Sequence, residues 1–467
     1  MTDISTADLS VVRTSPLAGF TGVTWEPGEP GYDEVRHVFN GMVDRRPALI
    51  ARCTSADDVS AAVRHAVAVG LPVSVYGGGH SVTGVAVVDG GLCIDLRGMK
   101  SLDVDPGNRT VRAGAGLTWG ELDAACQEHG LAVTGGRVSS TGVAGLALGS
   151  GSGWLERAFG FTCDNLLSAE VVTAEGRQVT ASPTSNPDLF WGLRGGGGNF
   201  GIVTEFVLRL HPVGPIVLGG LLMYPAQQAQ AVTRAWRDLM LAAPDALGTG
   251  LAFITAPPAD FVPEPVRGLP VIGVIVCWSG PVEDGRAALA PLTDALPPAI
   301  DMVQPMPYVA VQQLIDAGNP PGMRNYWSGD FFEGLPDEAI DTFIAKATAP
   351  VSPLTSIILT PGRGAIARVP EDATAFGTRD AAFQAHYLGM WADPADDERN
   401  IAAIRSLATD MKPWTTGTAY LNFLGDEGQQ RIADSFGAEK YARLRELKQT
   451  WDPTNLFRHN QNIPPAD

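Results

Sequence analysis

Three clusters of glycine are the residues of this sequence best suited to hold a phosphate-bearing ligand. They are Gly77–Gly79, the glycine-rich stretch 142–153 and Gly195–Gly198, and at least two of them adjoin a predicted strand. Glycine lets a backbone approach a ligand closely and present its N–H groups to phosphate oxygens. One such cluster is equally well explained by a tight turn, but three between residues 77 and 198 favour a bound cofactor.

The common nucleotide-binding fingerprints are absent from these clusters. No GxGxxG opens a helix with an acidic residue about twenty positions later, and no GxxxxGK[ST] occurs in the chain. The sequence therefore predicts a large nucleotide held by the loops of a less common fold.

His80 directly follows the first glycine cluster, where a predicted strand over 71–76 ends. A histidine at such a place could be an ordinary surface residue. Its position inside a glycine loop favours the alternative, in which the imidazole contacts the cofactor or bonds to it covalently.

The composition limits the other ligands of the chain. Its 467 residues allow two or three domains, and 33 basic against 51 acidic residues give a net charge of −18. This charge disfavours nucleic acid and anionic lipid as partners. The five cysteines are widely spaced and form no CxxC, so neither a disulfide framework nor a metal site is expected. The start is not typical of a signal peptide, and no apolar run reaches the ~20 residues that span a bilayer, so we expect a cytoplasmic protein.

Short strand–helix–strand units position these residues in the first half of the chain. A helix after the first strand is capped by Ser55 and ended by Gly70, and a capping box begins at Thr118 for a helix that Gly130 stops. The predicted strands here are 47–52, 71–76, 110–113, 167–172, 177–181 and 202–210. A helix is also expected over 32–43, and a short one after Asn186.

Beyond residues 212–215 the pattern changes to longer strands that alternate with amphipathic, Ala-rich helices. This pattern predicts an α+β unit in which helices cover a sheet. Strands are expected at 217–224, 271–278, 355–359, 383–391 and 418–423, and helices near 226–242, 282–296, 337–348 and 398–409.

Four longer segments have the order and spacing of a known family. They are VYGGGHSVTG, GGRVSSTGVAGLALGSGSGWLERAFGFTCDNLLS, NPDLFWGLRGGGGNFGIVTEF and DPTNLFRHNQNIPP. They resemble the berberine bridge enzyme-like FAD-linked oxidoreductases of the vanillyl-alcohol oxidase, or PCMH-type FAD-binding, superfamily, over about residues 44–215 and 416–465. The resemblance implies an α+β fold with a two-subdomain FAD-binding domain (1–215, core 44–215). It also implies a substrate domain with an antiparallel sheet covered by helices (216–415) and a C-terminal return to the FAD domain (416–467).

The resemblance implies that the cofactor is FAD and that His80 bonds covalently to its flavin ring. Val138 stands where many members have a cysteine that makes a second bond, so a single attachment is implied. The residues implied to contact FAD are Tyr76, Gly77, Gly78, Gly79, His80, Ser81, Val138, Ser140, Thr141, Gly142, Val143, Gly145, Leu148, Gly149, Asp164, Asn165, Gly198, Asn199, Ile202, Val203, Tyr420, Asn422, Asn460 and Asn462.

The segment AYLNF, residues 419–423, is similar to a family element that reaches back over the flavin. The resemblance implies a catalytic role for Tyr420 and Asn422, whereas the alternative is a tyrosine packed between sheet and helix. A tyrosine that acts as base near neutral pH needs positive charge or hydrogen-bond donors nearby, because its ordinary pKa is about 10. Asn422 could donate one such bond.

His386 and Tyr387 are two further candidates for catalysis, on the predicted strand 383–391. Alternation along a strand places Tyr387 and Trp391 on one face and His386 on the other. One face should look onto the pocket, but the sequence does not tell which. The alternative, at least as well supported by the sequence, is that His386, Tyr387 and Trp391 only pack within the sheet.

These features predict an FAD-dependent oxidoreductase that removes a hydride from a C–H beside an alcohol or amine. Its substrate would be a small molecule such as a sugar, an alkaloid or another secondary metabolite, and O₂ is the expected acceptor. The alternatives are a dehydrogenase that excludes O₂ and a flavin-binding protein without turnover. Val138, and Phe159 in the place of a frequent active-site tyrosine, make the last conceivable. We expect a monomer or homodimer without nucleic-acid or membrane partners.

Overall fold

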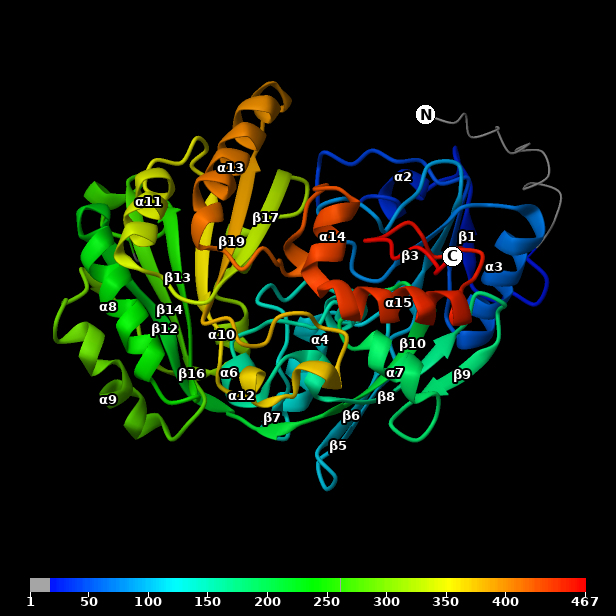
Figure 1. Ribbon diagram of the computed structural model, residues 1–467, viewed down its shortest axis with the longest axis horizontal. Coiled ribbons are helices and arrows are strands. Elements are labelled where there is room, and N and C mark those ends of the chain that lie inside the picture. The colour runs from blue at the N-terminus through cyan, green and yellow to red at the C-terminus, as the bar shows by residue number, and fades with distance from the viewer. Residues whose placement is uncertain (1–16, 261) are drawn as a thin grey trace.

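The strands before residue 216 and those after it belong to separate sheets, which lie in two lobes side by side (Figure 1). The computed structural model of the protein describes residues 17–260 and 262–467. The mixed α+β class predicted from the sequence is confirmed.

The first lobe holds two main sheets. The first has the order β1-β2-β4-β3, with β4 parallel to both β2 and β3, and the second is an antiparallel sheet of order β5-β6-β10-β8-β9. These strands are β1 (Val23–Trp25), β2 (Leu49–Arg52), β3 (Val73–Tyr76), β4 (Leu92–Asp95), β5 (Leu102–Asp105), β6 (Thr110–Gly114), β8 (Leu166–Val172), β9 (Gln178–Ala181) and β10 (Ile202–Arg209). Between the lobes, β7 (Leu131–Ala132) pairs with β11 (His211–Pro212).

The helices of the first lobe begin and end where the local sequence requires. They are α2 (Tyr32–Val35), α3 (Ala56–Val69), α4 (Trp119–Gln127), α5 (Val143–Leu148), α6 (Glu156–Phe159) and α7 (Pro187–Leu193). The side chain of Ser55 accepts a hydrogen bond from the Asp58 N–H, and Gly70 ends α3 in the left-handed conformation, with φ 71°. The capping box of Thr118 and Glu121 at the start of α4 is confirmed as well.

One antiparallel sheet dominates the second lobe, in the order β15-β12-β14-β13-β18-β19-β17, with β16 paired to β12. Its strands are β12 (Ile216–Pro225), β13 (Leu247–Thr255), β14 (Pro270–Trp278), β15 (Ile300–Asp301), β16 (Gln304–Pro307), β17 (Arg324–Phe332), β18 (Ser356–Pro361) and β19 (Phe383–Trp391). The helices are α8 (Ala229–Ala242), α9 (Val282–Thr293), α10 (Tyr308–Gln312), α11 (Asp337–Ala347), α12 (Ala365–Arg368) and α13 (Asp397–Met411). The predicted antiparallel sheet covered by helices is thus confirmed.

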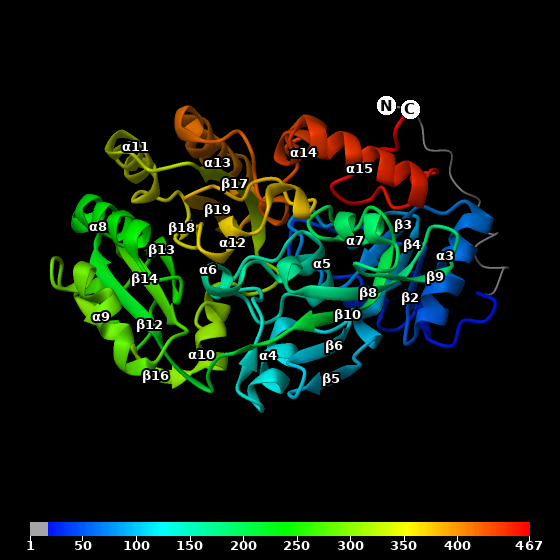
Figure 2. The ribbon, with the colours of Figure 1, turned by 60° about the horizontal axis from the view of Figure 1, so that its bottom comes forward.

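The long helices cover one face of this sheet, and on the other face the short α10 packs against β12 and β14. Trp236 of α8 and Phe343 of α11 pack with Phe253 and Ile357 of the strands in one apolar core. Figure 2 shows α8 and α9 on the outer side of β12–β14, and the first lobe on the other side. The face that the long helices leave uncovered is therefore turned toward the first lobe.

The chain returns to the first lobe at its end. Helices α14 (Gln429–Phe436) and α15 (Ala438–Trp451) lie on that lobe (Figure 1), where Leu444 and Leu447 join its core. The segment 362–382 also contacts it, since the carbonyls of Asp372 and Ala373 accept hydrogen bonds from Trp191 and Arg194. The domain limits after residues 215 and 415 stay a prediction, and residues 1–16 of the first domain lie outside the described residues.

Two predicted elements are wrong, because contacts between distant segments replace local hydrogen bonds. The helix expected over 32–43 ends at Val35, and beyond it the N–H of Gly41 donates to Met323 O (2.8 Å) in the second lobe. The strand expected over 418–423 is instead an irregular segment followed by a 3₁₀ turn, Leu421–Phe423. This turn lets Asn422 lie directly on Gly149, where no other residue type would leave it room.

Candidate functional site

A large cavity lies between the first lobe and the uncovered face of the large sheet. Its volume is about 1180 Å³, and residues of both lobes line it. Cavities that hold drug-sized ligands measure about 300–1,000 Å³, so this one has room for a dinucleotide with a substrate beside it.

The first two glycine clusters meet at the cavity wall. A side chain on Gly78 would collide with the backbone of Gly142, and one on Gly142 would collide with the backbone of Gly78. Gly79 has a φ of 70°, in the left-handed region that favours glycine. The two loops thus need glycine to pack backbone against backbone beside the cavity.

Gly145 on α5 and Gly198 in the third cluster have open space before them. A Cβ atom at either position would meet no heavy atom within 4 Å, and both residues line the cavity. The predicted cofactor residues that line it are Gly77, Gly78, Gly79, His80, Ser81, Val138, Thr141, Gly142, Gly145, Leu148, Gly149, Gly198, Asn199, Ile202, Val203, Tyr420, Asn422 and Asn460. All three clusters therefore contribute backbone to one wall.

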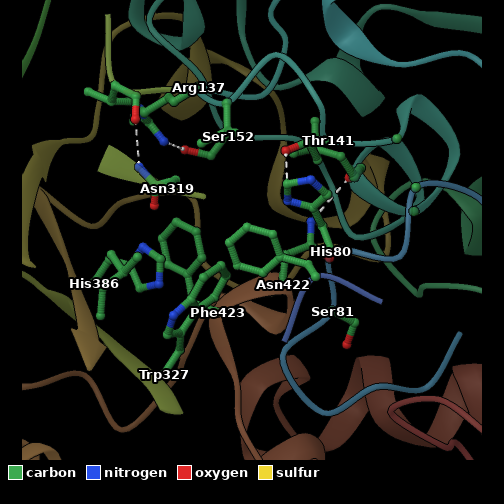
Figure 3. A pocket seen from close by; sticks show the side chains of 18 of the residues that line it. His80, Ser81, Arg137, Thr141, Ser152, Asn319, Trp327, His386, Asn422 and Phe423 are labelled. Atoms are coloured by element: carbon green, nitrogen blue, oxygen red, sulfur yellow. Dashed lines mark hydrogen bonds between the residues drawn. The ribbon is translucent and has the colours of Figure 1, made fainter. Parts of the chain in front are cut away.

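His80 is held at this wall by three neighbours. Its Nε2 lies 3.0 Å from Ser140 Oγ, its Nδ1 lies 3.4 Å from Thr141 Oγ1, and its ring stacks on Phe39 with 4.5 Å between centroids (Figure 3). Burial lowers the pKa of His80 to about 4. The imidazole is therefore neutral near pH 7 and keeps a lone pair for bond formation.

The C-terminal tail closes over the third glycine cluster. Asn460 Nδ2 donates to Gly198 O (3.2 Å), and Asn199 Nδ2 donates to Gln461 O (3.1 Å). Asn199 Oδ1 accepts from the N–H of Ile463 (3.0 Å). Asn460 Oδ1 is buried without a hydrogen bond among the described residues, which leaves an acceptor that a ligand at this wall can satisfy.

Four predicted cofactor residues, Tyr76, Ser140, Val143 and Asn462, do not line the cavity. Tyr76 donates to His37 O (2.6 Å) and its ring lies against the Arg97 guanidinium, while Val143 is fully buried in the core. Ser140 reaches the site only through His80. Asn462 lies outside the wall, and its backbone oxygen accepts from a side chain of α14.

Asp164 and Asn165 join segments of the protein and do not line the cavity either. Asp164 accepts two hydrogen bonds from the buried Arg379 guanidinium, at 2.7 and 3.0 Å, and so ties the first lobe to segment 362–382. Asn165 donates to the carbonyls of Phe159 and Phe161 (both 2.9 Å). Their contact with the cofactor therefore stays a prediction, and in the structure both side chains hold protein segments together.

Tyr420 is buried at the cavity wall, with three hydrogen-bond donors around its oxygen. The N–H groups of Gly151 (3.0 Å) and Ser152 (2.8 Å) and the side-chain amide of Asn422 (3.1 Å) all donate to it. Burial raises the pKa of Tyr420 to about 12, although hydrogen bonds from Ser152 and Asn422 oppose this rise. Tyr420 is therefore a protonated phenol near neutral pH.

His386 lies on the cavity face of β19, among aromatic rings. It stacks on Phe423 with 3.6 Å between centroids and meets the edge of Trp327 at 4.9 Å. Figure 3 shows this group and His80 at opposite sides of the view. Burial, and to a smaller extent the Arg137 guanidinium, lowers the pKa of His386 well below its ordinary value. Its Nε2 is buried and has no partner among the described residues.

Tyr387 points to the opposite face of the same strand. It is fully buried in the core under the helices, where its ring lies 6.3 Å from that of Phe343. Alternation thus brings His386, and not Tyr387, to the cavity, and we assign no catalytic role to Tyr387.

Many residues of the cavity wall were not predicted from the sequence, among them Phe39, Trp327 and Arg137. Arg137 donates to Ser152 Oγ (2.9 Å) and pairs with the buried Glu156 (3.0 Å). Its place directly before Val138 in a glycine-rich loop was a usable signal. Phe39 and Trp327 come from distant segments, and no sequence pattern marked either of them as a site residue.

The other expectations concern metals, cysteines and membranes. No group of three or more His, Cys, Asp or Glu residues in the described parts of the chain could hold a metal ion, and the five cysteines are buried and free. In the same parts, no helix is both long and apolar enough to cross a bilayer.

The cavity suits the cofactor that the sequence predicts. Its wall combines backbone from three glycine clusters, two positions where only a glycine leaves space, a neutral imidazole at His80 and an unsatisfied acceptor at Asn460. These are the features that a dinucleotide with a phosphate bridge requires.

Comparison with known proteins agrees with this geometry. Residues 47–182 match the FAD binding domain family, and residues 419–464 match the berberine and berberine-like family. An FAD-linked oxidoreductase of Bacillus subtilis, YgaK, is 31% identical over 94% of this chain and 95% of its own length. (R)-6-hydroxynicotine oxidase of Paenarthrobacter nicotinovorans is 31% identical over 98% of this chain and 99% of its own.

Solved structures show the same likeness along the whole chain. The crystal structure of 6-hydroxy-D-nicotine oxidase from Arthrobacter nicotinovorans superimposes with a TM-score of 0.87 at 28% identity, over 97% of this chain and all of that one. The protein therefore belongs to the berberine bridge enzyme-like family of FAD-linked oxidoreductases.

Proposed function

We propose that the protein is an oxidase that removes a hydride from a C–H bond beside a hydroxyl or amino group of a small molecule. The main support is the single cavity that joins three glycine clusters and His80 to a second wall with His386 and Tyr420. The two 6-hydroxynicotine oxidases named above are oxidases by name, and they match this chain over nearly its full length.

FAD, when bound, supplies the two-electron acceptor, and the chain supplies binding, orientation and proton transfer. The glycine clusters and Asn460 hold the dinucleotide, and His80 anchors the flavin. The second wall, formed by the uncovered sheet face and Phe423, holds the substrate and keeps water from it.

We propose His386 as the acceptor of the substrate proton. Removal of a hydride beside a hydroxyl leaves a protonated carbonyl unless the O–H proton departs, so a base is needed. Such a base must be unprotonated and free to accept. The lowered pKa of His386 keeps its imidazole neutral near pH 7, and its Nε2 has no partner among the described residues.

Tyr420 fails the first condition for a base, because burial raises its pKa to about 12 and keeps the phenol protonated near pH 7, although hydrogen-bond donors around its oxygen oppose this rise. We propose instead that it donates its own hydrogen into the cavity. Asn422 and the N–H groups of Gly151 and Ser152 hold the phenol in place for this contact.

We expect the flavin to be attached through His80 alone. Acid-precipitated protein should stay yellow, and a tryptic flavopeptide should contain His80, because this imidazole is neutral and Val138 at the same wall carries no thiol. Mass spectrometry of the peptide checks the attachment.

His80→Ala is the control for attachment. It should fold and bind FAD loosely, since the glycine clusters remain. A colourless pellet from the unmodified protein, or a flavopeptide from residues 137–145, would show that this assignment is mistaken.

Gly145→Leu should abolish retention of FAD with little effect on folding. The new side chain would enter open cavity space that we assign to the cofactor, and leucine suits a helix better than glycine does. Flavin absorbance after gel filtration and the thermal midpoint of the apoprotein measure the two effects.

Gly334→Leu is the matched control, because that glycine also has no heavy atom near a Cβ but lies outside the cavity wall. It should keep its FAD. Normal FAD content in the Gly145 variant would mean that the dinucleotide lies elsewhere.

Two other functions are alternatives to the oxidase. A dehydrogenase would share every feature of this cavity and differ only in the rate of reoxidation by O₂. A flavin-binding protein without turnover was suggested by Phe159, but this ring stacks on His211 (4.2 Å) away from the cavity wall, so the substitution removes no polar group from it. The cytoplasmic location and the monomeric or homodimeric state remain proposals.

A further inference from the structure

The large sheet is apolar on both faces, although the long helices cover only one of them and α10 covers the other only near β12 and β14. On β18, Ile357 and Leu359 pack under the helices, while Ile358 between them lines the cavity. The other large aliphatic side chains that the strands β12, β13, β14 and β19 add to this wall are Leu221, Ile254, Ile275, Leu388 and Met390. Ile275 and Leu221 also contact a core formed with α10 and the first lobe, whereas the part of this face that borders the cavity presents apolar side chains to its occupant.

Polar atoms are few on the same face. The sheet contributes the side chains of Thr255, Gln304, Ser356, Thr360 and His386 to the wall. The Thr360 hydroxyl already donates a hydrogen bond to Gln384 Oε1 (3.5 Å), so its hydrogen is not free for a ligand. A sugar carries a hydroxyl on nearly every carbon, and each one buried without a partner weakens binding. The sheet side of the cavity therefore offers few hydrogen-bond partners to an oligosaccharide.

The charges at the cavity also restrict the substrate. No Asp or Glu occurs among the described residues that line it, whereas Arg137 and Arg267 do. Arg137 is already paired with Glu156, and Arg267 lies 3.9 Å from Asp260. An ammonium ion would have no counter-ion here and would face guanidinium groups. The cost of burying its unpaired charge would therefore weaken its binding.

The rings around His386 favour a flat partner. Trp327, His386 and Phe423 line one end of the cavity and contact one another edge-on and face-on. Aromatic side chains in this arrangement contact a planar ring by stacking or by its edge.

We infer that the substrate is a largely apolar, uncharged molecule that contains a ring and presents one hydroxyl or neutral amino group to His386. Oligosaccharides and ammonium ions are excluded as good ligands. This inference rests on the proposed function, since it assigns the occupant of the same cavity.

Binding of three unreactive or unsuitable probes to the FAD-loaded protein tests it. The probes are 2-naphthol, cellobiose and benzyltrimethylammonium, and the readouts are the flavin difference spectrum and the thermal midpoint, neither of which needs turnover. We expect 2-naphthol to bind at least about 100-fold more tightly than either other probe, because only its ring buries apolar surface without stranding polar or charged groups. Cellobiose or benzyltrimethylammonium binding within about tenfold of 2-naphthol would overturn the inference.

Two variants on one strand locate the binding. Ile358→Asn on the cavity face should weaken 2-naphthol about tenfold, whereas Ile357→Val on the covered face should leave its Kd unchanged. Equal affinity of both variants would overturn the assignment to this wall. Should the Asn variant fold poorly, Ile358→Ala, which only shortens the side chain, carries the same comparison.

The results separate the substrate class from the oxidase function. Tight binding of 2-naphthol without bleaching of the flavin by any alcohol, amine or sugar would support the substrate class and refute the oxidase. Bleaching of the flavin by cellobiose would support the oxidase and refute the substrate class.

Discussion

Replacing His386 by alanine is expected to slow anaerobic flavin reduction by about 10²–10⁴-fold, the usual contribution of a positioned general base. The His386 side chain lines the cavity, its lowered pKa keeps it neutral near pH 7 and its buried Nε2 has no partner among the described residues, whereas alanine leaves the Tyr420 oxygen and its three donors untouched. Stopped-flow absorbance of the flavin measures the rate, and an unchanged oxidised spectrum shows that the cofactor is still bound normally.

The pH profile distinguishes His386 from Tyr420. Because the pKa of His386 lies well below 6.5, its neutral form prevails at higher pH, and the reduction rate should be flat from about pH 6.5 to 9 and fall only in acid. If the phenolate of Tyr420 were the base, its pKa of about 12 would make the rate rise about tenfold per pH unit over that range. A rising profile would therefore contradict the assignment.

Tyr387→Phe provides the matched control on the neighbouring position of the same strand. Its ring lies in the core on the covered face, so the reduction rate should stay within about threefold of the unmodified protein. A loss as large as that of His386→Ala would mean that both changes act through the packing of β19.

Tyr420→Phe is expected to slow flavin reduction about 10²-fold, as the loss of one hydrogen-bond donor at a reacting centre does. It also leaves the buried N–H groups of Gly151 and Ser152 without their acceptor, so the thermal midpoint should fall. The pH profile should keep its shape, since His386 remains. Stopped-flow kinetics and thermal unfolding measure the two effects.

Tyr224→Phe is the control for the loss of a buried phenol. The Tyr224 hydroxyl is buried without a partner in the described structure and lies outside the cavity wall, so its removal should change neither rate nor stability appreciably. A reduction rate for Tyr420→Phe within about threefold of the unmodified protein would make Tyr420 a packing residue.

Local sequence signals were sufficient to predict the elements that carry the cofactor wall. Ser55, Gly70 and the Thr118 capping box act on hydrogen bonds within a few residues of themselves, so their outcome could be derived from the sequence. His80 was recognisable for the same reason, because the glycine triplet and the strand end adjoin it in the chain.

Contacts between distant segments could not be derived in this way. Asn40, inside the helix expected over 32–43, donates to Asn325 O (2.9 Å), and this contact with the second lobe replaces helical continuation. The Asp164–Arg379 ion pair joins residues 215 positions apart, so a motif position alone could not distinguish it from a cofactor contact. Alternation along β19 separated His386 from Tyr387, but only the position of the helices decides which face is covered.

Anaerobic mixing of the FAD-loaded protein with apolar cyclic and benzylic alcohols, followed by O₂, tests the proposed function most directly. We predict that at least one of these alcohols bleaches the oxidised flavin band, and that O₂ then restores it rapidly. A band that bleaches but returns slowly in air would identify a dehydrogenase. No bleaching by any of these alcohols, nor by a matching panel of amines and sugars, would contradict the assignment of an oxidoreductase reaction to this cavity.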